Sequence, residues 1–127
     1  MTVAHLDTVL VVEDDPGIRR LMSRVLRHEG FQVEEAPDGP QALQALERPR
    51  SPSDGLCLMV LDLLLPTMSG VDVLRYLAQQ SSQIPVVAMS ANHEALEAAA
   101  AAGAQATLEK PIELDRLLEV VGRCCPH

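Results

Sequence analysis

The sequence predicts an α/β fold with a doubly wound parallel sheet of five strands and helices on both faces. Short apolar runs alternate five times with helical apolar stripes, which is typical of successive strand–helix units. The run TVLVV, from Thr8 to Val12, is also continuous and rich in β-branched residues, as expected of a strand buried on both faces. Because 127 residues suit one domain, we expect a single domain over residues 1–127.

The first two strand–helix units differ in how deeply their strands should be buried. After Thr8–Val12, Asp15 is predicted to cap a helix that has Pro16 in its first turn. This helix has an apolar face opposite a face of arginines, and the residues expected to pack on the sheet are Ile18, Leu21, Met22, Val25 and Leu26. Residues 31–36 form a more polar run, which suits an edge strand, and residues 40–47 form a short helix.

Three further units complete the predicted sheet after a proline- and serine-rich loop over residues 48–55. They are a strand over 56–61 with a helix over 71–80, a strand over 84–89 with an alanine-rich helix over 94–102, and a strand over 106–108 with a helix from Glu113. The helix over 71–80 should turn Val71, Leu74, Leu77 and Ala78 to the core. Pro85 is tolerable because it lies at the start of its strand, and Gly103 is a typical residue just after a helix.

Composition excludes several classes of function. The chain has 10 basic and 18 acidic residues, a net charge of −8, and only 2% aromatic residues, Phe31 and Tyr76. Such a chain lacks the basic surface that binds nucleic acid or anionic membranes, so we expect no direct nucleic acid and no membrane partner. No targeting or membrane-spanning segment is visible, and we expect a cytoplasmic location. Cys57, Cys124 and Cys125 match neither a disulfide framework nor a zinc pattern, so we expect reduced thiols.

Polar residues directly follow four of the five predicted strands. Glu13, Asp14 and Asp15 follow the first; single polar residues follow the third, fourth and fifth, namely Asp62, Ser90 and Lys110. The carboxyl ends of parallel strands meet at one edge, where ligands of such sheets bind. Three carboxylates and one ammonium would leave a charge of about −2 there, which favours a hard cation such as Mg²⁺. The alternative is that the acids only cap the first helix and fill a turn, which we favour for Asp15.

Four motifs in this order resemble the receiver domain of two-component response regulators: VVEDD at 11–15, LDLLLPTMSG at 61–70, VVAMSA at 86–91 and EKP at 109–111. The resemblance covers nearly the whole chain and implies the flavodoxin-like strand order 2-1-3-4-5, which the handedness and length of the units do not themselves give. It also implies a cis bond before Pro111, and it places Pro66 and Gly70 in the turn after Asp62.

The resemblance implies a mechanism in which Asp62 accepts a phosphoryl group from a histidine kinase, a phosphotransfer protein or a small donor such as acetyl phosphate. Mg²⁺ would be held by Glu13, Asp14, Asp62 and the backbone carbonyl of Leu64. Lys110 and the hydroxyl of Ser90 would contact the phosphoryl oxygens, with the N–H of Ala91 as a further donor. The output would be a changed binding surface for a downstream protein or output domain, with a homodimer as one form, and no enzyme activity beyond the domain's own phosphorylation and dephosphorylation.

Two departures from the family pattern bear on signalling. Thr107 stands three residues before Lys110, where the family usually has Tyr or Phe as a rotamer switch. Leu64 and Asn92 stand two residues after Asp62 and Ser90, positions that flank the hydrolytic water, and because a leucine side chain cannot orient water we expect a long-lived phosphoryl group.

Three other functions were weighed. A haloacid dehalogenase-type phosphatase needs a second acid where Leu64 stands, and a flavodoxin would not place acids at 13–15 beside its phosphate. The alternative that stays open is a pseudo-receiver, a protein-interaction module that is never phosphorylated. The sequence also leaves open whether this chain acts alone or is the N-terminal part of a longer regulator.

Overall fold

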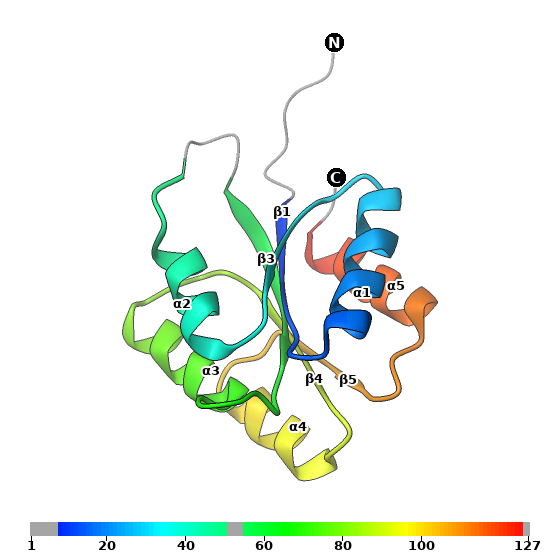
Figure 1. The fold of residues 1–127 in the computed structure, drawn as a ribbon. Helices are drawn as coiled ribbons and strands as arrows, with labels where there is room; N and C mark the ends of the chain where they lie inside the picture. The colour runs from blue at the N-terminus through cyan, green and yellow to red at the C-terminus, as the bar shows by residue number, and fades with distance from the viewer. Residues whose placement is uncertain (1–7, 51–54, 126–127) are drawn as a thin grey trace.

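The fold is a five-stranded parallel sheet between two layers of helices, seen in a computed structural model that describes residues 8–50 and 55–125 (Figure 1). The strand order is β2-β1-β3-β4-β5, and every neighbouring pair is parallel. The predicted flavodoxin-like fold class is therefore confirmed. In chain order the elements are β1 Thr8–Val12, α1 Pro16–His28, β2 Gln32–Ala36, α2 Gly39–Glu47, β3 Leu56–Asp62, α3 Gly70–Gln79, β4 Val86–Ser90, α4 His93–Ala101, β5 Ala106–Glu109 and α5 Leu114–Cys124.

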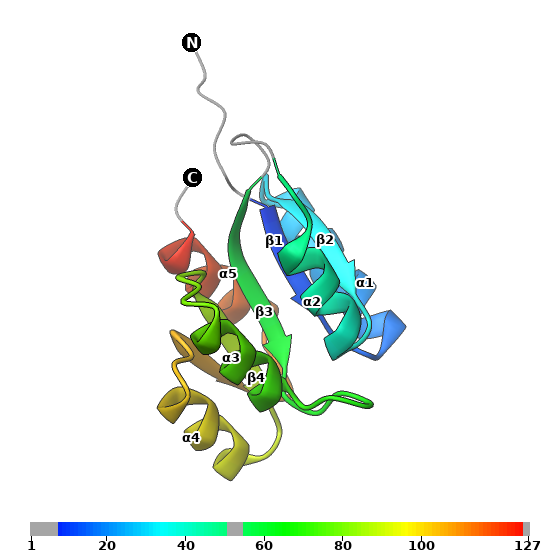
Figure 2. The same cartoon turned by 90° about the vertical axis from the view of Figure 1, so that its left-hand side faces the viewer.

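The helices divide between the two faces of the sheet, so the protein has two separate cores. Helices α2, α3 and α4 cover one face, while α1 and α5 cover the other (Figures 1 and 2). Alternate residues of β1 supply the two cores: Leu10 and Val12 face the first group of helices, and Val9 and Val11 face the second. This alternation explains why the central strand is apolar at every position.

Local sequence signals set the helix starts. Asp15 caps α1, since its carboxylate oxygen accepts the N–H of Ile18 at 3.0 Å, which confirms the predicted cap. The side chains of Asp38, Ser69 and Asn92 do the same for α2, α3 and α4. β2 is the expected edge strand, and its Glu34 forms ion pairs with Arg48 and Arg50 instead of packing in a core.

The structure corrects the predicted packing and some boundaries. Ile18 and Leu21, expected on the sheet, are 41% and 46% exposed, because the stripe of α1 continues beyond the part of the helix that contacts the strands. Ala78 is exposed, and Val73 is buried in its place. β4 begins at Val86, two residues later than predicted, because Pro85 has no N–H for the ladder. Other ends differ by one residue, and residues 51–54 of the predicted loop lie outside the described residues.

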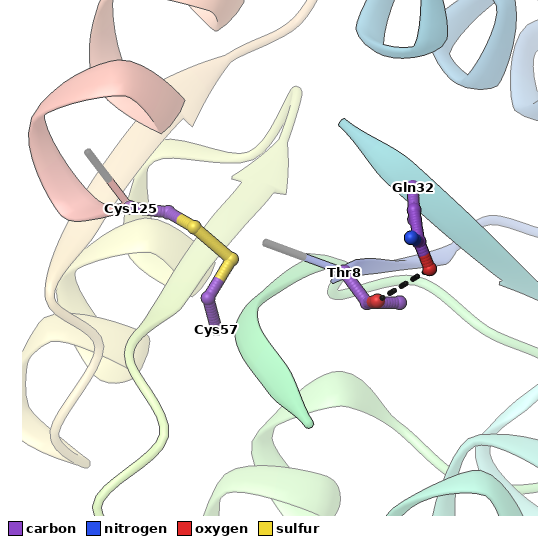
Figure 3. The surroundings of a disulfide bond; sticks show 4 residues. All are labelled: Thr8, Gln32, Cys57 and Cys125. Atoms are coloured by element: carbon purple, nitrogen blue, oxygen red, sulfur yellow. Dashed lines mark hydrogen bonds between the residues drawn. A yellow bond between two sulfur atoms is a disulfide. The ribbon is translucent and has the colours of Figure 1, made fainter. Parts of the chain in front are cut away.

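The prediction of three reduced cysteines is wrong for two of them. Cys57 of β3 and Cys125, at the end of α5, form a disulfide across 68 residues of sequence, with their Cα atoms 5.8 Å apart, and Cys124 is a free thiol (Figure 3). Sequence spacing could not show this pairing, because it depends on α5 ending beside the start of β3. No helix among residues 8–50 and 55–125 is long and apolar enough to cross a membrane.

Candidate functional site

The polar residues that follow the strands meet in one cleft at the carboxyl edge of the sheet, the lower edge in Figure 1. The cleft has a volume of about 710 Å³, and its lining contains every predicted side chain of the site: Glu13, Asp14, Asp15, Asp62, Ser90 and Lys110. The backbone residues expected to take part, Leu64 and Ala91, line it too. The structure therefore brings together the residues that the sequence placed at separate strand ends.

Lys110 joins the two buried carboxylates. Its Nζ lies 3.1 Å from Oε1 of Glu13 and 3.2 Å from Oδ2 of Asp62. Both acids are almost fully enclosed, with 1% and 2% of their surface exposed, so these charge-assisted hydrogen bonds form in a region of low dielectric. Because one ammonium faces two carboxylates, the buried centre keeps an excess negative charge.

The second oxygens of both acids accept backbone N–H groups. Asp62 Oδ1 accepts the N–H of Leu64 at 3.1 Å, and Glu13 Oε2 accepts the N–H of Asp15 at 3.2 Å. Each acid is thus held through both oxygens, once by Lys110 and once by its own following loop. This arrangement fixes the orientation of both carboxylates before any ligand arrives.

The buried charges shift two pKa values. Burial raises the pKa of Glu13 to about 7, the N–H of Asp15 opposes the rise, neighbouring Asp62 adds to it, and Lys110 opposes it. Burial by itself would lower the pKa of Lys110, but its hydrogen bonds and charge contacts with Glu13 and Asp62 outweigh burial and raise it. Lys110 therefore stays charged near neutral pH, while Glu13 is divided between its two protonation states.

Backbone contacts set the positions of the acceptor carboxylate and the lysine. The N–H of Leu63, after β3, donates to Met89 O at 2.9 Å, and the N–H of Lys110 donates to Ser90 O at 2.9 Å, so the ends of β3, β4 and β5 are tied in a row. The bond between Lys110 and Pro111 is cis, as the resemblance implied. Gly70 lies directly against the end of β3, where an added Cβ would come within 2.7 Å of Leu63 Cα and 2.8 Å of the carbonyl oxygen of Asp62.

Three predicted participants have other or additional contacts. The Oγ of Ser90 accepts the N–H of Asn92 at 3.0 Å, which leaves its O–H free to donate toward the cleft. Asn92, predicted beside the hydrolytic water, uses its amide oxygen to accept the N–H of Ala95 and cap α4. Leu64 is 82% exposed at the cleft.

Two residues of α1 contribute to the site and were missed from the sequence. Ile18, expected in the core, instead lines the cleft. Arg19 donates from Nη1 to the carbonyl oxygen of Glu13 at 2.8 Å and pairs with Glu35 of β2 at 3.2 Å, so it fastens the end of β1. The only available signal was the position of both residues one turn after the acidic triplet, which by itself indicates nothing about contact.

The acidic cluster suits a hard divalent cation. Glu13, Asp14 and Asp62 each offer an oxygen, and these oxygens lie within 4.8 Å of one another. Two of the acids are buried and one is exposed, so the cluster has one side open to the cleft. An all-oxygen donor set with excess negative charge is the chemistry that Mg²⁺ requires.

Thr107, at the family's usual aromatic position, leaves space on either side of β5. One hollow of about 330 Å³ lies against α4, lined by Leu96, Ala100 and Thr107, and another of about 350 Å³ lies against the start of α5, lined by Thr107, Pro111 and Ile112. The small side chain is thus not compensated by a larger neighbour that fills its place.

Comparison with known proteins points to one family. A model of the response regulator receiver domain matches residues 9–122. Curated relatives include the probable transcriptional regulatory protein TcrX of Mycobacterium tuberculosis, 36% identical over 114 residues, and the response regulator MprA of Mycobacterium leprae, 34% identical over 112. Each match covers 87% of this chain but only 46% and 47% of those proteins, so the chain spans about half the length of the curated relatives it matches.

Solved structures agree with this assignment. The receiver domain of the Francisella response regulator 1452 superposes with a TM-score of 0.84 at 26% identity, over 93% of this chain and 95% of that one. The chemotaxis response regulator CheY4 of Vibrio cholerae superposes with a TM-score of 0.83 at 28% identity, over 94% and 98% of the two chains.

Proposed function

The chain belongs to the response regulator receiver domain family, and we propose that it receives a phosphoryl group on Asp62 and passes the signal on through a changed binding surface. One observation carries the proposal: the buried carboxylate of Asp62 lies 3.2 Å from the ammonium of Lys110, inside a cluster of three acids at the carboxyl edge of the sheet. A family member of this kind is a signalling domain and not an enzyme that turns over an external substrate.

In the proposed step, an oxygen of Asp62 attacks phosphorus in line with the bond to the donor. A new P–O bond forms while the P–N bond of a phosphohistidine, or the P–O bond of acetyl phosphate, breaks, and the leaving group keeps the electron pair. Oδ2 is the attacking oxygen we favour, because Oδ1 is held by the N–H of Leu64 while Oδ2 contacts only the mobile ammonium of Lys110 among the contacts described.

Lys110 and Ser90 then stabilise the transferred group. Lys110 exchanges its contact with Asp62 for a phosphoryl oxygen, which preserves its partner charge in a buried setting. The hydroxyl of Ser90 donates to a second oxygen, since its own acceptor site is already used by the N–H of Asn92. The N–H of Ala91 is the third donor we propose.

We propose that Glu13, Asp14 and Asp62, with the Leu64 carbonyl, hold Mg²⁺ in this site. The oxygen donors of the three acids fit the ion, as their spacing and charge indicate. When bound, the cation supplies positive charge that offsets the charge of the transferring phosphoryl group.

The partners follow from the reaction and stand as proposals with it. They are a histidine kinase or phosphotransfer protein as donor, and a downstream protein or output domain as receiver of the signal, with homodimerisation as one possible output form. We further propose that residues 1–127 form one receiver domain and that it works in the cytoplasm. Its net charge of −8 supports the absence of nucleic acid and membrane among the partners of this domain.

The test is intact-mass spectrometry after incubation with acetyl phosphate and Mg²⁺. We expect a mass gain of one phosphoryl group that is absent when Mg²⁺ is chelated and absent in Asp62→Asn. Asp72→Asn is the matched control, because Asp72 is an exposed acid on α3 that pairs with Arg75 away from the cleft, and it should be phosphorylated like the wild type. An adduct that persists in Asp62→Asn refutes the proposed acceptor.

The unfilled space beside Thr107 favours a second candidate, a pseudo-receiver that binds partners without phosphorylation. The same experiment separates the two functions. A folded wild type that gains no phosphoryl group from acetyl phosphate, nor from a phosphorylated histidine phosphotransfer protein, would support the pseudo-receiver.

A further inference from the structure

The disulfide lies at the end of the sheet opposite the cleft. Cys57 is the second residue of β3, and Cys125 directly follows α5. Figure 3 shows the bond at the same end of the sheet as Thr8 and Gln32, the first residues of β1 and β2, which pair in register. Asp62 is the last residue of β3, so the crosslink and the carboxylate lie about 17 Å apart along one strand.

The same two parts of the chain are therefore joined at both ends. At the cleft, Lys110 precedes α5 by a short turn and forms an ion pair with Asp62 at the end of β3. At the opposite end, Cys125 closes α5 onto the start of β3. One of these connections is an ion pair that a ligand can displace, and the other is covalent. Whether the covalent one is present decides how firmly the carboxyl end of α5 is held.

The environment of the bond permits exchange at one sulfur. Cys125 is 3% exposed and packs in the core between the sheet, α1 and α5, whereas Cys57 is only half-buried at the border of that core. A small thiolate can therefore approach the sulfur of Cys57, and Cys125 is the leaving group. Cys124, the remaining cysteine of the sequence, is half-buried, and burial raises the pKa of its thiol, so it is a poor nucleophile at neutral pH.

We propose that Cys57 and Cys125 form a reversible redox modification site that exchanges with low-molecular-weight thiols and disulfides, and that its oxidation fixes the end of α5 to the strand that carries Asp62. In reduction, a thiolate RS⁻ attacks Cys57 and Cys125 leaves as a thiolate that takes a proton. A second RSH then releases RSSR and the thiol of Cys57. In oxidation, the two cysteines return two electrons and two protons to RSSR, which leaves as two RSH. The site does not depend on phosphorylation, so it stands or falls separately from the function of Asp62.

The first test counts thiols by alkylation with iodoacetamide in denaturant, followed by intact-mass spectrometry. We expect one labelled cysteine in the untreated protein and three after native incubation with millimolar reduced glutathione. Cys124→Ser is the matched control and should give none and two. Three labels before any reduction would show that the bond is absent, and one label after glutathione would show a permanent bond; either result overturns the proposal.

The second test is hydrogen–deuterium exchange of the wild type in oxidised and reduced glutathione. We expect the amides of the last turn of α5, residues 121–125, to exchange about tenfold faster in the reduced protein, because their covalent anchor is lost. The amides of α1, on the same face of the sheet, should be unchanged and report that the fold is intact. Cys57→Ser without reductant should match the reduced wild type. Equal exchange of α5 in both redox states would overturn the proposed anchoring.

Discussion

The titration of Glu13 makes a quantitative prediction about metal binding. With a pKa of about 7, its carboxyl group is protonated in half of the metal-free molecules at neutral pH. A cation binds only the ionised form, so proton and metal compete for one site. Lys110 does not titrate in this range, because its pKa is raised above the usual lysine value. The perturbation is therefore a change of pH between 6 and 8, with Mg²⁺ affinity as the observable.

The magnitude follows from the competition. For one group of pKa about 7, the apparent dissociation constant of Mg²⁺ is multiplied by about 11 at pH 6, 2 at pH 7 and 1.1 at pH 8. Mg²⁺ should thus bind about tenfold more tightly at pH 8 than at pH 6, and binding at pH 7 should release about half a proton. The same shift means that the metal-free fold is most stable in acid, and that this contribution is lost as the pH rises through 7, since the folded carboxyl holds its proton more tightly than the unfolded one.

Isothermal titration calorimetry at constant ionic strength measures both quantities. Affinity is determined at pH 6, 7 and 8, and the proton release is obtained at pH 7 in two buffers of different ionisation enthalpy. Glu13→Gln is the control, in which binding should be weaker but should no longer change with pH between 6 and 8. Wild-type affinity that is constant across this range refutes the reasoning, as does a pH dependence that persists in Glu13→Gln.

Three further predictions concern the acceptor loop, the packing behind it and the edge strand. Leu64→Asn should lose its phosphoryl group several-fold faster than the wild type, because an amide can hold water where the exposed leucine cannot; the decay of the phosphorylated mass measures this, with Leu64→Met as control, and faster loss from the wild type contradicts it. Gly70→Ala should lower the free energy of unfolding by about 1–3 kcal/mol in urea, because its Cβ would lie 2.7 Å from Leu63 Cα, whereas Gly122→Ala, where nothing lies within 4 Å, should raise it by about 1 kcal/mol. An unchanged Gly70→Ala would show that β3 and α3 can separate without cost. Glu34→Gln should cost about 1 kcal/mol at pH 7, because Arg50 holds the pKa of this carboxyl below its usual range; the difference from the wild type should vanish as the pH falls through that lowered value, and Glu119→Gln, an exposed ion pair, should change stability by only a few tenths of a kcal/mol.

The fold was predictable because its signals are local. β1 is apolar at every position since both faces of the central strand are covered, and each strand–helix unit repeats this contrast between a buried run and a one-sided helix. Caps such as Asp15 are equally local, because the capping carboxylate bonds an N–H only three residues away. Strand order is not local, and it came from the resemblance of four motifs to a family.

The gathering of the site residues was predictable for a related reason. Parallel strands align their carboxyl ends, so polar residues after separate strands had to meet at one edge. What stayed hidden depends on contacts between distant segments: the pairing of Cys57 with Cys125, and the exposure of Ile18, which lies over the cleft and not over the sheet. The near-complete burial of Glu13 was hidden too, because a residue after a strand is expected at the rim of the sheet.

The burial of Glu13 and Asp62 bears on the choice between a phosphoacceptor and a pure interaction module. Two carboxylates that are 1% and 2% exposed share one ammonium, and the cost of this arrangement is visible in the pKa of Glu13, which is raised to about 7. Neither side chain reaches the outer surface, so neither can contribute to a docking face. A module that only bound partners would be more stable with a neutral amide at either position, since the repulsion would be gone while the hydrogen bonds to Asp15 and Leu64 N–H groups would remain. The pair is explained by chemistry inside the cleft, where a cation and a transferred phosphoryl group make use of the excess negative charge and of Lys110 together.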